Sequence, residues 1–472
     1  MTIMRFNQYP EAFALDATRW LRALSGIVVC LILTHGAFAQ QSALNSQSLI
    51  YMDYPQPSAS VEPLQLGSFP SWATLDMQVR AREENQSSDK YVSGNDAVYA
   101  LTRVWGGLEI RPTRWLTGYL QFVDAHALGL PLYYVSPNQR DAFDDRQAFL
   151  EFHDKSLEIT AGRQELRYGG ERLVGISNWT DTSRTFDGFV GRIGNKNRLD
   201  LFSTSVVSIH ATSLDKHGAG LTFHGAVGTI STWVPHTVIQ PFIYLKALPR
   251  VESQQKTYGT ETEVTPGAEV SAKILGGFFF DMLGALQRGS YASDAIHSGA
   301  GYVKAGYSTQ ALDWKPRLGT EYDYASGSPH TDAQRIGTFD QLYPSNHNAF
   351  GLTDLFGFQN IKEERVNLDL APAKHLAVLI QQEWLRLSTV HDSVYSGSAS
   401  ATVKAPTGGF LSEDIGREFD ASGQYAFRDR VTLNAGAGHF LPGTLMSENA
   451  HGAPLTLAYF GLTYKFKVGA AE

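Results

Sequence analysis

The sequence predicts an all-β protein, a transmembrane antiparallel β-barrel of about 18 strands with short periplasmic turns and long extracellular loops. Three observations predict this fold class. Several segments alternate apolar and polar residues, short and long connections alternate along the chain, and an export leader precedes a region without a long apolar run. Because only helices and closed barrels satisfy their backbone groups in lipid, the spanning elements must be strands.

Residues 1–39 have the features of a signal peptide. Arg5, Arg19 and Arg22 precede a short apolar core at 27–33, and small residues at 37–39 fit a cleavage site before Gln40. The apolar core is too short to span a bilayer. We therefore expect Sec-dependent export to the outer membrane. The predicted organisation is a signal peptide at 1–39, a periplasmic lead-in at 40–71 and a barrel at 72–472.

Charge and cysteine usage exclude several classes of function. Cys30 is the one cysteine and lies inside the leader, so the exported chain has no disulfide, no thiol nucleophile and no cysteine-bound zinc. Without three basic and two acidic leader residues, the 39 Lys and Arg and 47 Asp and Glu leave a net charge of -9. Nucleic acid is therefore not an expected partner.

Period-two alternation is clearest at 75–82, where apolar side chains at odd positions oppose Asp76, Gln78, Arg80 and Arg82. Segments 115–123, 317–325, 417–427 and 460–466 repeat the pattern. The strands of a soluble β-sandwich also alternate, so alternation alone does not distinguish it from a membrane barrel. The charged polar face and the connection lengths must distinguish the two folds.

Connections of two kinds alternate, as expected when one rim carries tight turns and the other carries long loops. The strands within 219–248 are the least defined, and Pro235 and Pro241 are expected to mark a turn there. No plug domain precedes the first strand, which favours an open or loop-gated pore. Short turns are expected at 112–114, 154–155, 195–197, 276–277, 372–375 and 428–430, and long loops at 84–97, 124–146, 169–183, 208–218, 249–262, 326–362, 388–416 and 441–453.

The most distinctive motif spans 162–192 and reads GRQELRYGGERLVGISNWTDTSRTFDGFVGR. Its register is open, because Leu157, Ile159 and Ala161 share parity with Arg163: either a bulge near Gly162 shifts the register, or the charges lie above the lipid band. A third interpretation is a set of rim ion pairs that hold loops. The motif carries Arg163, Arg167, Arg172, Arg184 and Arg192 beside Glu165, Glu171, Asp181 and Asp187.

Together with 322–360 and the segment GHFLPG at 438–443, this motif closely resembles the alginate export family of outer-membrane proteins. The resemblance implies an 18-stranded monomeric barrel with a positively charged constriction and loops that gate each mouth. It assigns the constriction to Arg163, Arg172 and Asp187. Alternation adds Arg80, Arg82, Arg103, Arg317 and Glu321 as candidate lumen residues, and the rest of the motif adds Arg167, Arg184, Arg192, Glu165 and Glu171.

The resemblance implies a channel that exports an anionic polysaccharide, an alginate-like polyuronate, by loop-gated passive diffusion. Guanidinium groups suit this task because they contact carboxylates at two points and stay charged, and channels need weak, repeated sites. Expected partners are the polymer, outer-membrane lipids, the barrel-assembly machinery and periplasmic export components. We expect no cofactor and no metal.

Two alternatives stay open: a general or small-solute porin of the same fold, and a secreted carbohydrate-binding β-sandwich. Catalysis is not expected, because the sequence has no Gly-x-Ser-x-Gly elbow, no His-Glu-x-x-His motif and no phosphate-binding glycine loop. The last aromatic residue, Phe466, stands six residues before the end, whereas barrel-assembly signals usually finish on an aromatic residue.

Overall fold

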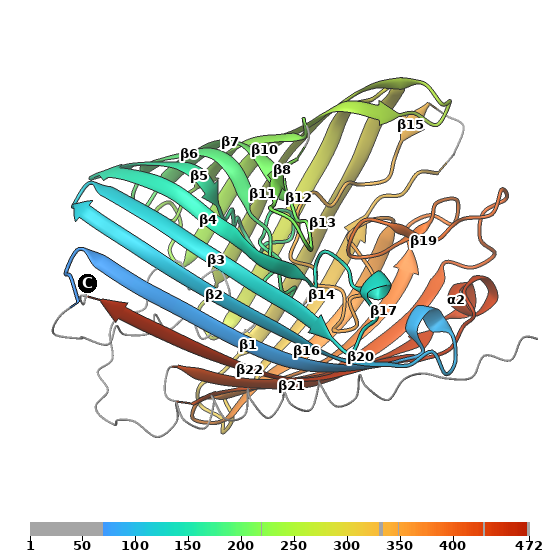
Figure 1. Ribbon diagram of the computed structural model, residues 1–472. Helices are drawn as coiled ribbons and strands as arrows, with labels where there is room; N and C mark the ends of the chain where they lie inside the picture. The colour runs from blue at the N-terminus through green and yellow to red at the C-terminus, as the bar shows by residue number, and fades with distance from the viewer. Residues whose placement is uncertain (1–68, 219, 330–333, 348, 428–429, 470–472) are drawn as a thin grey trace, which may run out of the picture. The chain divides into compact units, whose positions relative to one another are not determined.

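The computed structural model describes residues 69–472 except 219, 330–333, 348, 428–429 and 470–472 (Figure 1). The predicted signal peptide and nearly all of the predicted lead-in lie outside the described residues. The described chain belongs to one compact unit, Ile50–Glu472.

One sheet of twenty strands makes up most of this unit. Two of its strands, β8 (Lys216–His217) and β15 (Arg335–Ile336), have only two residues and pair beside β7 and β13. The wall consists of the other eighteen: β1 (Ala73–Ser87), β2 (Ala97–Thr113), β3 (Leu116–Leu128), β4 (Asp141–Asp154), β5 (Leu157–Gln164), β6 (Phe186–Gly194), β7 (Arg198–Ser208), β9 (Thr222–Thr229), β10 (Thr237–Glu252), β11 (Tyr258–Lys273), β12 (Phe278–Tyr291), β13 (Asp294–Ser308), β14 (Arg317–Ala325), β16 (Ile361–Ala373), β17 (Leu376–Leu387), β20 (Asp414–Phe427), β21 (Val431–Pro442) and β22 (Leu455–Gly469).

Each wall strand pairs antiparallel with its neighbours, and the wall closes because β22 pairs with β1. This ladder runs without a register shift from Thr74 opposite Gly469 to Ser87 opposite Thr456. Closure leaves the described wall without a free sheet edge, which is what a lipid environment demands. The predicted fold class, a closed antiparallel barrel, is therefore confirmed.

The alternation of the sequence appears as two faces of the wall. On β2, Val98, Val104 and Leu108 are exposed, whereas Leu101 and Arg103 between them are buried. Successive side chains of a strand point to opposite faces, so the exposed apolar set faces outward and the polar set faces the lumen.

Short turns join the strands at one rim, and long loops join them at the other. The prediction of a long loop at 249–262 is wrong. β10 continues to Glu252, β11 begins at Tyr258, and these two residues pair with each other, so the connection between the strands is short. Alternation is weak there because both faces are polar above the apolar band. Pro241 lies inside β10 instead of in the expected turn, and the β9–β10 ladder begins one residue later, at Phe242.

Several short elements lie in the connections at the long-loop rim. They are the 3-10 turns η3 (Asp89–Tyr91) and η4 (Leu132–Tyr134), helix α2 (Thr444–Asn449), and a two-stranded sheet of β18 (Val394–Tyr395) and β19 (Ala401–Val403). Within the described residues, no helix is long and apolar enough to cross a membrane.

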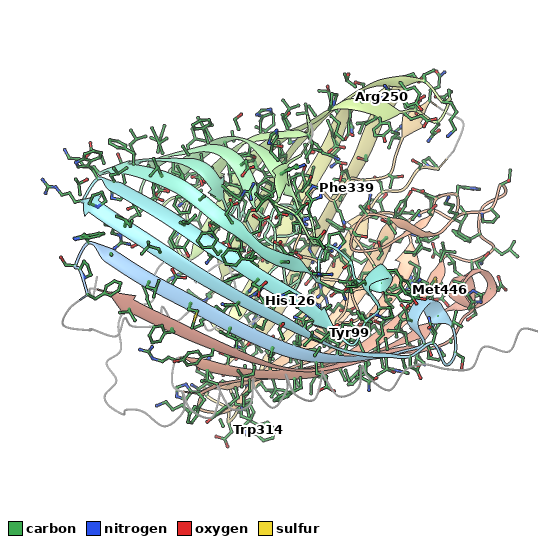
Figure 2. All side chains as sticks on the ribbon, viewed as in Figure 1. Tyr99, His126, Arg250, Trp314, Phe339 and Met446 are labelled. Carbon is green, nitrogen blue, oxygen red and sulfur yellow. The ribbon has the colours of Figure 1, made fainter. Side chains whose placement is uncertain are left out.

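The apolar core lies inside the barrel. Two connections fold inward. They are loop 165–185 between β5 and β6, and loop 326–360 between β14 and β16, of which the described residues after β15 (337–347 and 349–360) turn into the barrel. Phe339, which is labelled in Figure 2, belongs to the second loop and is fully buried. Fully buried side chains of both loops pack on each other and on the wall, including Leu166, Val174, Phe339, Phe350, Phe356 and Phe358 against Phe186, Phe223 and Phe440.

Candidate pore and its two in-folded loops

Three arginines point from the first two strands into the lumen. Arg80 and Arg82 alternate on β1, and Arg103 of β2 lies directly opposite Arg80 in the ladder. All three are buried, with exposed fractions of 9%, 3% and 1%. Burial of a charge is costly unless it is paired or hydrogen-bonded, so the groups that cover these guanidiniums determine what the site can do.

Loop 165–185 covers Arg80 with its backbone carbonyls. The guanidinium donates to the carbonyl oxygens of Asn178 at 2.7 Å, Trp179 at 2.9 Å and Thr180 at 2.9 Å. It also forms an ion pair with Asp181, whose side chain is fully buried. One wall arginine therefore holds four consecutive loop residues.

Arg82 and Arg103 hold the same segment. Arg82 donates to the Trp179 carbonyl at 2.8 Å, and its guanidinium lies 3.6 Å from the centroid of the Trp179 ring. Its Nε donates to Glu84 at 2.6 Å. Arg103 donates to the Thr180 carbonyl at 3.1 Å. Neutral carbonyls therefore supply most of the acceptors for these cations, and hydrogen bonds to charged groups are each worth roughly 1.5–3 kcal/mol.

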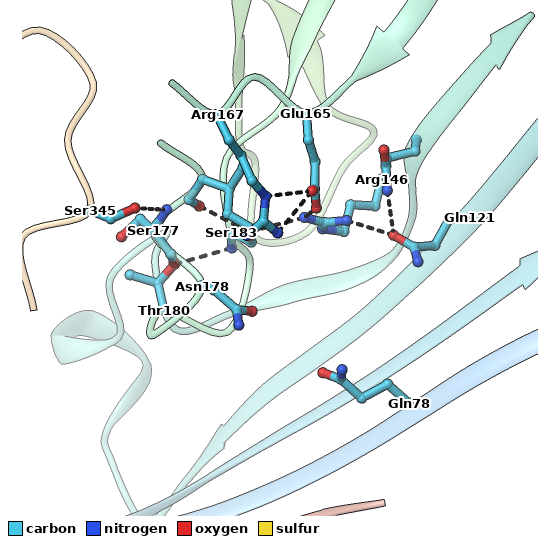
Figure 3. Close-up of polar contacts among 12 residues, drawn as sticks. Gln78, Gln121, Arg146, Glu165, Arg167, Ser177, Asn178, Thr180, Ser183 and Ser345 are labelled. Atoms are coloured by element: carbon cyan, nitrogen blue, oxygen red, sulfur yellow. Dashed lines mark hydrogen bonds and ion pairs between the residues drawn. The ribbon is translucent and has the colours of Figure 1, made fainter. Parts of the chain in front are cut away.

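Glu165 links loop 165–185 to β4 (Figure 3). Its carboxylate pairs with Arg146 on one side and with Arg167 at 2.9 Å on the other. Arg146 also donates to Gln121 of β3 at 2.6 Å. Burial favours the protonated carboxyl, but the two arginines outweigh it and lower the pKa of Glu165 to about 2.

The two in-folded loops bind each other through their backbones. Gly175 donates to the Tyr343 carbonyl at 2.8 Å, and Tyr343 donates to the Leu173 carbonyl at 2.9 Å. The Trp179 and His347 rings stack with centroids 3.6 Å apart. The loops therefore form one unit inside the barrel.

Arg184 and Glu171 stabilise this junction. Arg184 donates to the carbonyls of Tyr343 at 2.7 Å and Pro344 at 3.0 Å, and burial lowers its pKa to about 10. Glu171 accepts from the Ser345 hydroxyl at 2.6 Å. Both residues hold loops together rather than facing an open passage.

Arg172 reaches from loop 165–185 to another part of the wall. It pairs with Glu321 and, at 3.0 Å, with Asp323 of β14. Burial opposes the charged form, but Asp323 and Glu321 raise the pKa of Arg172 above its usual range. The guanidinium also lies 4.9 Å from the centroid of the Tyr302 ring.

Carboxylates gather on the wall from β14 to β20. They outnumber the cations beside them, which are Arg172, Arg365 and Lys304. Buried arginines therefore cluster on β1, β2 and β4, whereas acidic residues predominate on β14, β16, β17 and β20, where Arg365 of β16 is also buried. The buried acids are Glu321, Asp323, Glu363, Glu383, Glu418 and Asp420.

Arg192 and Arg317 also face the lumen, nearer the rim with the short turns. Arg192 pairs with Glu158 and, at 3.5 Å, with Asp200. Arg317 opens β14, pairs with Asp369 at 3.5 Å and lies 4.0 Å from the centroid of the Phe279 ring.

Arg163 and Asp187 occupy the outer face of the wall. β5 pairs with β4 and β6 without a register shift, so Arg163 keeps the parity of the exposed Leu157 and Ile159. Its Nε donates to Asp187, its partner on β6, at 2.9 Å. The alternative of a bulge near Gly162 is wrong. The interpretation of this pair as lumen-lining is corrected, because both residues lie outside the wall at the long-loop rim.

The structure adds Arg146, Glu363 and Arg365 to the candidate site. Arg146 lies at a register shift between β3 and β4. It is an extra residue on β4, so its face does not follow from the alternation of its neighbours. Glu363 and Arg365 alternate with Lys362 and Glu364, so both faces of this segment read as polar. The signal in the sequence is a run of consecutive charged residues, in which charges occupy both odd and even positions of one strand.

Comparison with known proteins places the chain in a class and then in a family. The closed wall of eighteen strands with a charged lumen is that of a bacterial outer-membrane β-barrel channel. The chain belongs to the alginate export family, whose model matches residues 71–454. No curated protein matches the sequence significantly. Neither the family nor the similar structures point to an enzyme.

Several solved structures share the fold at low sequence identity. OccAB2 of Acinetobacter baumannii has a TM-score of 0.58 at 11% identity over 85% of this chain and 100% of its own. OccK11 (OpdR) of Pseudomonas aeruginosa has a TM-score of 0.56 at 12% identity over 85% and 97%. OpdK of Pseudomonas aeruginosa, solved with vanillate, has a TM-score of 0.57 at 11% identity over 85% and 100%.

Proposed function

We propose that this outer-membrane channel exports an anionic polysaccharide, an alginate-like polyuronate, as a monomer by loop-gated passive diffusion. One observation carries the proposal. Arg80, Arg82 and Arg103 face the lumen, and they are covered chiefly by the backbone carbonyls of residues 178–180. If that loop withdraws, Arg80 and Arg103 lose their loop acceptors and line the passage beside Arg82, which keeps its wall partner Glu84. Barrel-assembly machinery and periplasmic export components remain expected partners.

Polyuronate chemistry fits this arrangement. A polyuronate carries about one carboxylate per sugar, and a guanidinium binds a carboxylate at two points without losing its charge. Carboxylates of the polymer can replace the loop carbonyls as acceptors. The acidic wall around Glu321 and Glu418 offers the same polymer few cationic contacts, which suits the weak binding that a channel needs for transit.

The conformation described here is the closed one under this proposal. Loops 165–185 and 326–360 share a buried apolar core and a set of backbone hydrogen bonds inside the barrel. Passage of a polymer requires at least loop 165–185 to leave the wall arginines. The free energy that the polymer gains at those arginines offsets the contacts that the loop loses.

Planar-bilayer recording tests the proposal with matched arginine variants. Wild type should be anion-selective and blocked by oligouronates but not by neutral oligosaccharides of equal length. The double variant Arg82→Gln with Arg103→Gln should raise the half-blocking concentration at least about tenfold, because each charged contact is worth roughly 1.5–3 kcal/mol. Conductance should rise, since the loop loses its anchors.

Arg163→Gln is the control, because it removes an arginine from the outer face and should leave block and conductance unchanged. Absence of both anion selectivity and oligouronate block in wild type would contradict the proposal.

A small-solute channel is the second candidate. It is favoured by the likeness to OpdK, whose structure holds vanillate, a small carboxylate. Under this alternative the same arginines bind single carboxylates, and chain length should not strengthen block. Block that grows with oligouronate length favours the polymer, and equal block by a monocarboxylate favours the small solute.

A further inference from the structure

We propose that Asp141, Asp144 and Asp215 form a binding site for a calcium ion at the extracellular rim of the barrel. One carboxylate oxygen from each residue lies within 4.8 Å of the others. The proposal concerns the rim between β4 and the connection from β7 to β9, and it does not depend on what the channel transports.

A local irregularity of β4 brings two of the carboxylates together. Residues three apart on a regular strand face opposite sides, yet Asp141 pairs with the buried Ala125 and Asp144 pairs with the buried Val123. The register shifts between these two pairs, and Phe143 adopts a positive φ of 41°. The bulge therefore turns both aspartates to the same face.

Asp141 supplies the observation that points to a ligand. It is only 2% exposed, and its Oδ1 has no hydrogen-bond partner among the described residues. A buried carboxylate without a partner is costly unless it is neutralised or coordinates a metal. Its nearest acidic neighbours, Asp144 and Asp215, face the same small space.

The other two carboxylates are held in place by backbone groups. Asp144 accepts from the backbone N–H of Asp145 at 2.6 Å and from that of Asp215. Asp215 accepts from the backbone N–H of His210 at 2.7 Å. Each carboxylate oxygen has a second lone pair, so these contacts orient the groups and still leave acceptor capacity for an ion.

Among the described residues, no cation forms an ion pair with the side chains of this triad. The guanidinium of Arg163 contacts Asp187, Asp145 and the backbone carbonyl of Asp215, and it has no ion pair with the side chains of the triad.

The barrel contains an informative contrast in Glu261, Glu263 and Asp340, which converge in the same way. There the ammonium of Lys246 pairs with Asp340 and, at 3.2 Å, with Glu261. One acidic group therefore has its cation, and the other lacks one.

Calcium fits the chemistry of the triad. It is a hard cation that takes 6–8 oxygen ligands in flexible geometry, which carboxylates and water can provide. Zinc prefers nitrogen and sulfur ligands, and none belongs to this set. A bound ion would tie the segment around Asp215 to the start of β4, which would stiffen the rim beside Arg163.

Calcium titration of the folded, detergent-solubilised full-length mature protein tests the site. After chelator treatment, calorimetry with calcium chloride should show one saturable site. Asp141→Asn should weaken this binding at least about tenfold, a loss comparable with that of other ligand-shell changes. Asp215→Asn should behave in the same way.

Glu261→Gln is the control, because it removes a carboxylate from the group that already holds Lys246, and it should bind calcium as wild type does. Heat-modifiable migration on a gel shows that each variant is folded. Absence of saturable binding in folded wild type, or equal binding by wild type and Asp141→Asn, would overturn the proposal.

Discussion

At the scale of single residues, arginines of the wall hold loop 165–185 by donating hydrogen bonds to its carbonyls. An anion can replace those carbonyls as the acceptor. Lysine could supply the charge, but it could not donate to several consecutive carbonyls from one planar group as Arg80 does. Arg103 donates to carbonyl and amide oxygens, which hold this cation without neutralising it. The charge of Arg103 is therefore available to an anion that displaces the loop.

Glu165 makes this anchoring dependent on pH. Its pKa is lowered from 4.5 to about 2, so the stabilisation by Arg146 and Arg167 is present above its ordinary pKa and is lost as pH falls toward 2. We expect the closed conductance of wild type to stay constant from about pH 7 to pH 5 and to rise as pH falls from about 4 to 2.

Glu165→Gln should show the raised conductance already at neutral pH and a smaller change on acidification. Bilayer recording across this pH range measures both effects. A wild-type conductance that does not increase below about pH 4, or a variant identical to wild type, would show that Glu165 does not hold the loop.

The parity of a residue along its strand determines which face of the wall it occupies. Parity alone placed Arg80, Arg82 and Arg103 on the polar face, and the structure puts them there because β1 and β2 have an unbroken register in this segment. The family resemblance assigns Arg163 to the lumen. Arg163 lies an even number of residues after Ile159, however, and this spacing predicts the outer face. Parity was the better guide, because a strand keeps its two faces until a bulge intervenes.

At the scale of elements, the loops differ from ordinary connections because they carry a core. Phe358 is fully buried and contacts the rings of Phe339 and Phe350. Replacing a buried phenylalanine by alanine typically costs 3–5 kcal/mol. Such a loss inside the two loops should loosen them and leave the eighteen-stranded wall intact.

We therefore expect Phe358→Ala to raise channel conductance and the rate of proteolysis within 326–360, with unchanged heat-modifiable migration. Phe189→Ala is the matched control, because Phe189 is 65% exposed on the outer face of β6. Proteolysis and conductance equal to wild type in Phe358→Ala would argue against a shared loop core. Unfolding of the barrel would show instead that the loops and the wall form one cooperative unit.

The positions of the loops could not be read from the sequence. The expected boundaries at 169–183 and 326–362 were close, because polar and glycine-rich stretches mark where strands end. That these loops fold inward depends on contacts between residues about 170 positions apart, such as Gly175 with Tyr343. Periodicity contains no information about such distant pairs.

At the scale of the whole molecule, strand closure and charge distribution act together. Closure of β1 on β22 brings the arginine-bearing strands within a few strands of the acidic β20. The chain carries net negative charge, so any attraction for a polyanion must come from this local division of the lumen. β22 continues to Gly469, three residues beyond Phe466, so the early aromatic residue lies inside the closing strand.

Flux of defined oligouronates into proteoliposomes tests the central claim, passage of an anionic polymer, most directly. Uptake should occur for oligouronates of increasing length, should exceed that of neutral oligosaccharides of equal length, and should fall in the double variant Arg82→Gln with Arg103→Gln but not in Arg163→Gln. If only mono- or dicarboxylates enter and longer oligouronates are excluded, the protein is a small-solute channel and the polymer proposal is contradicted.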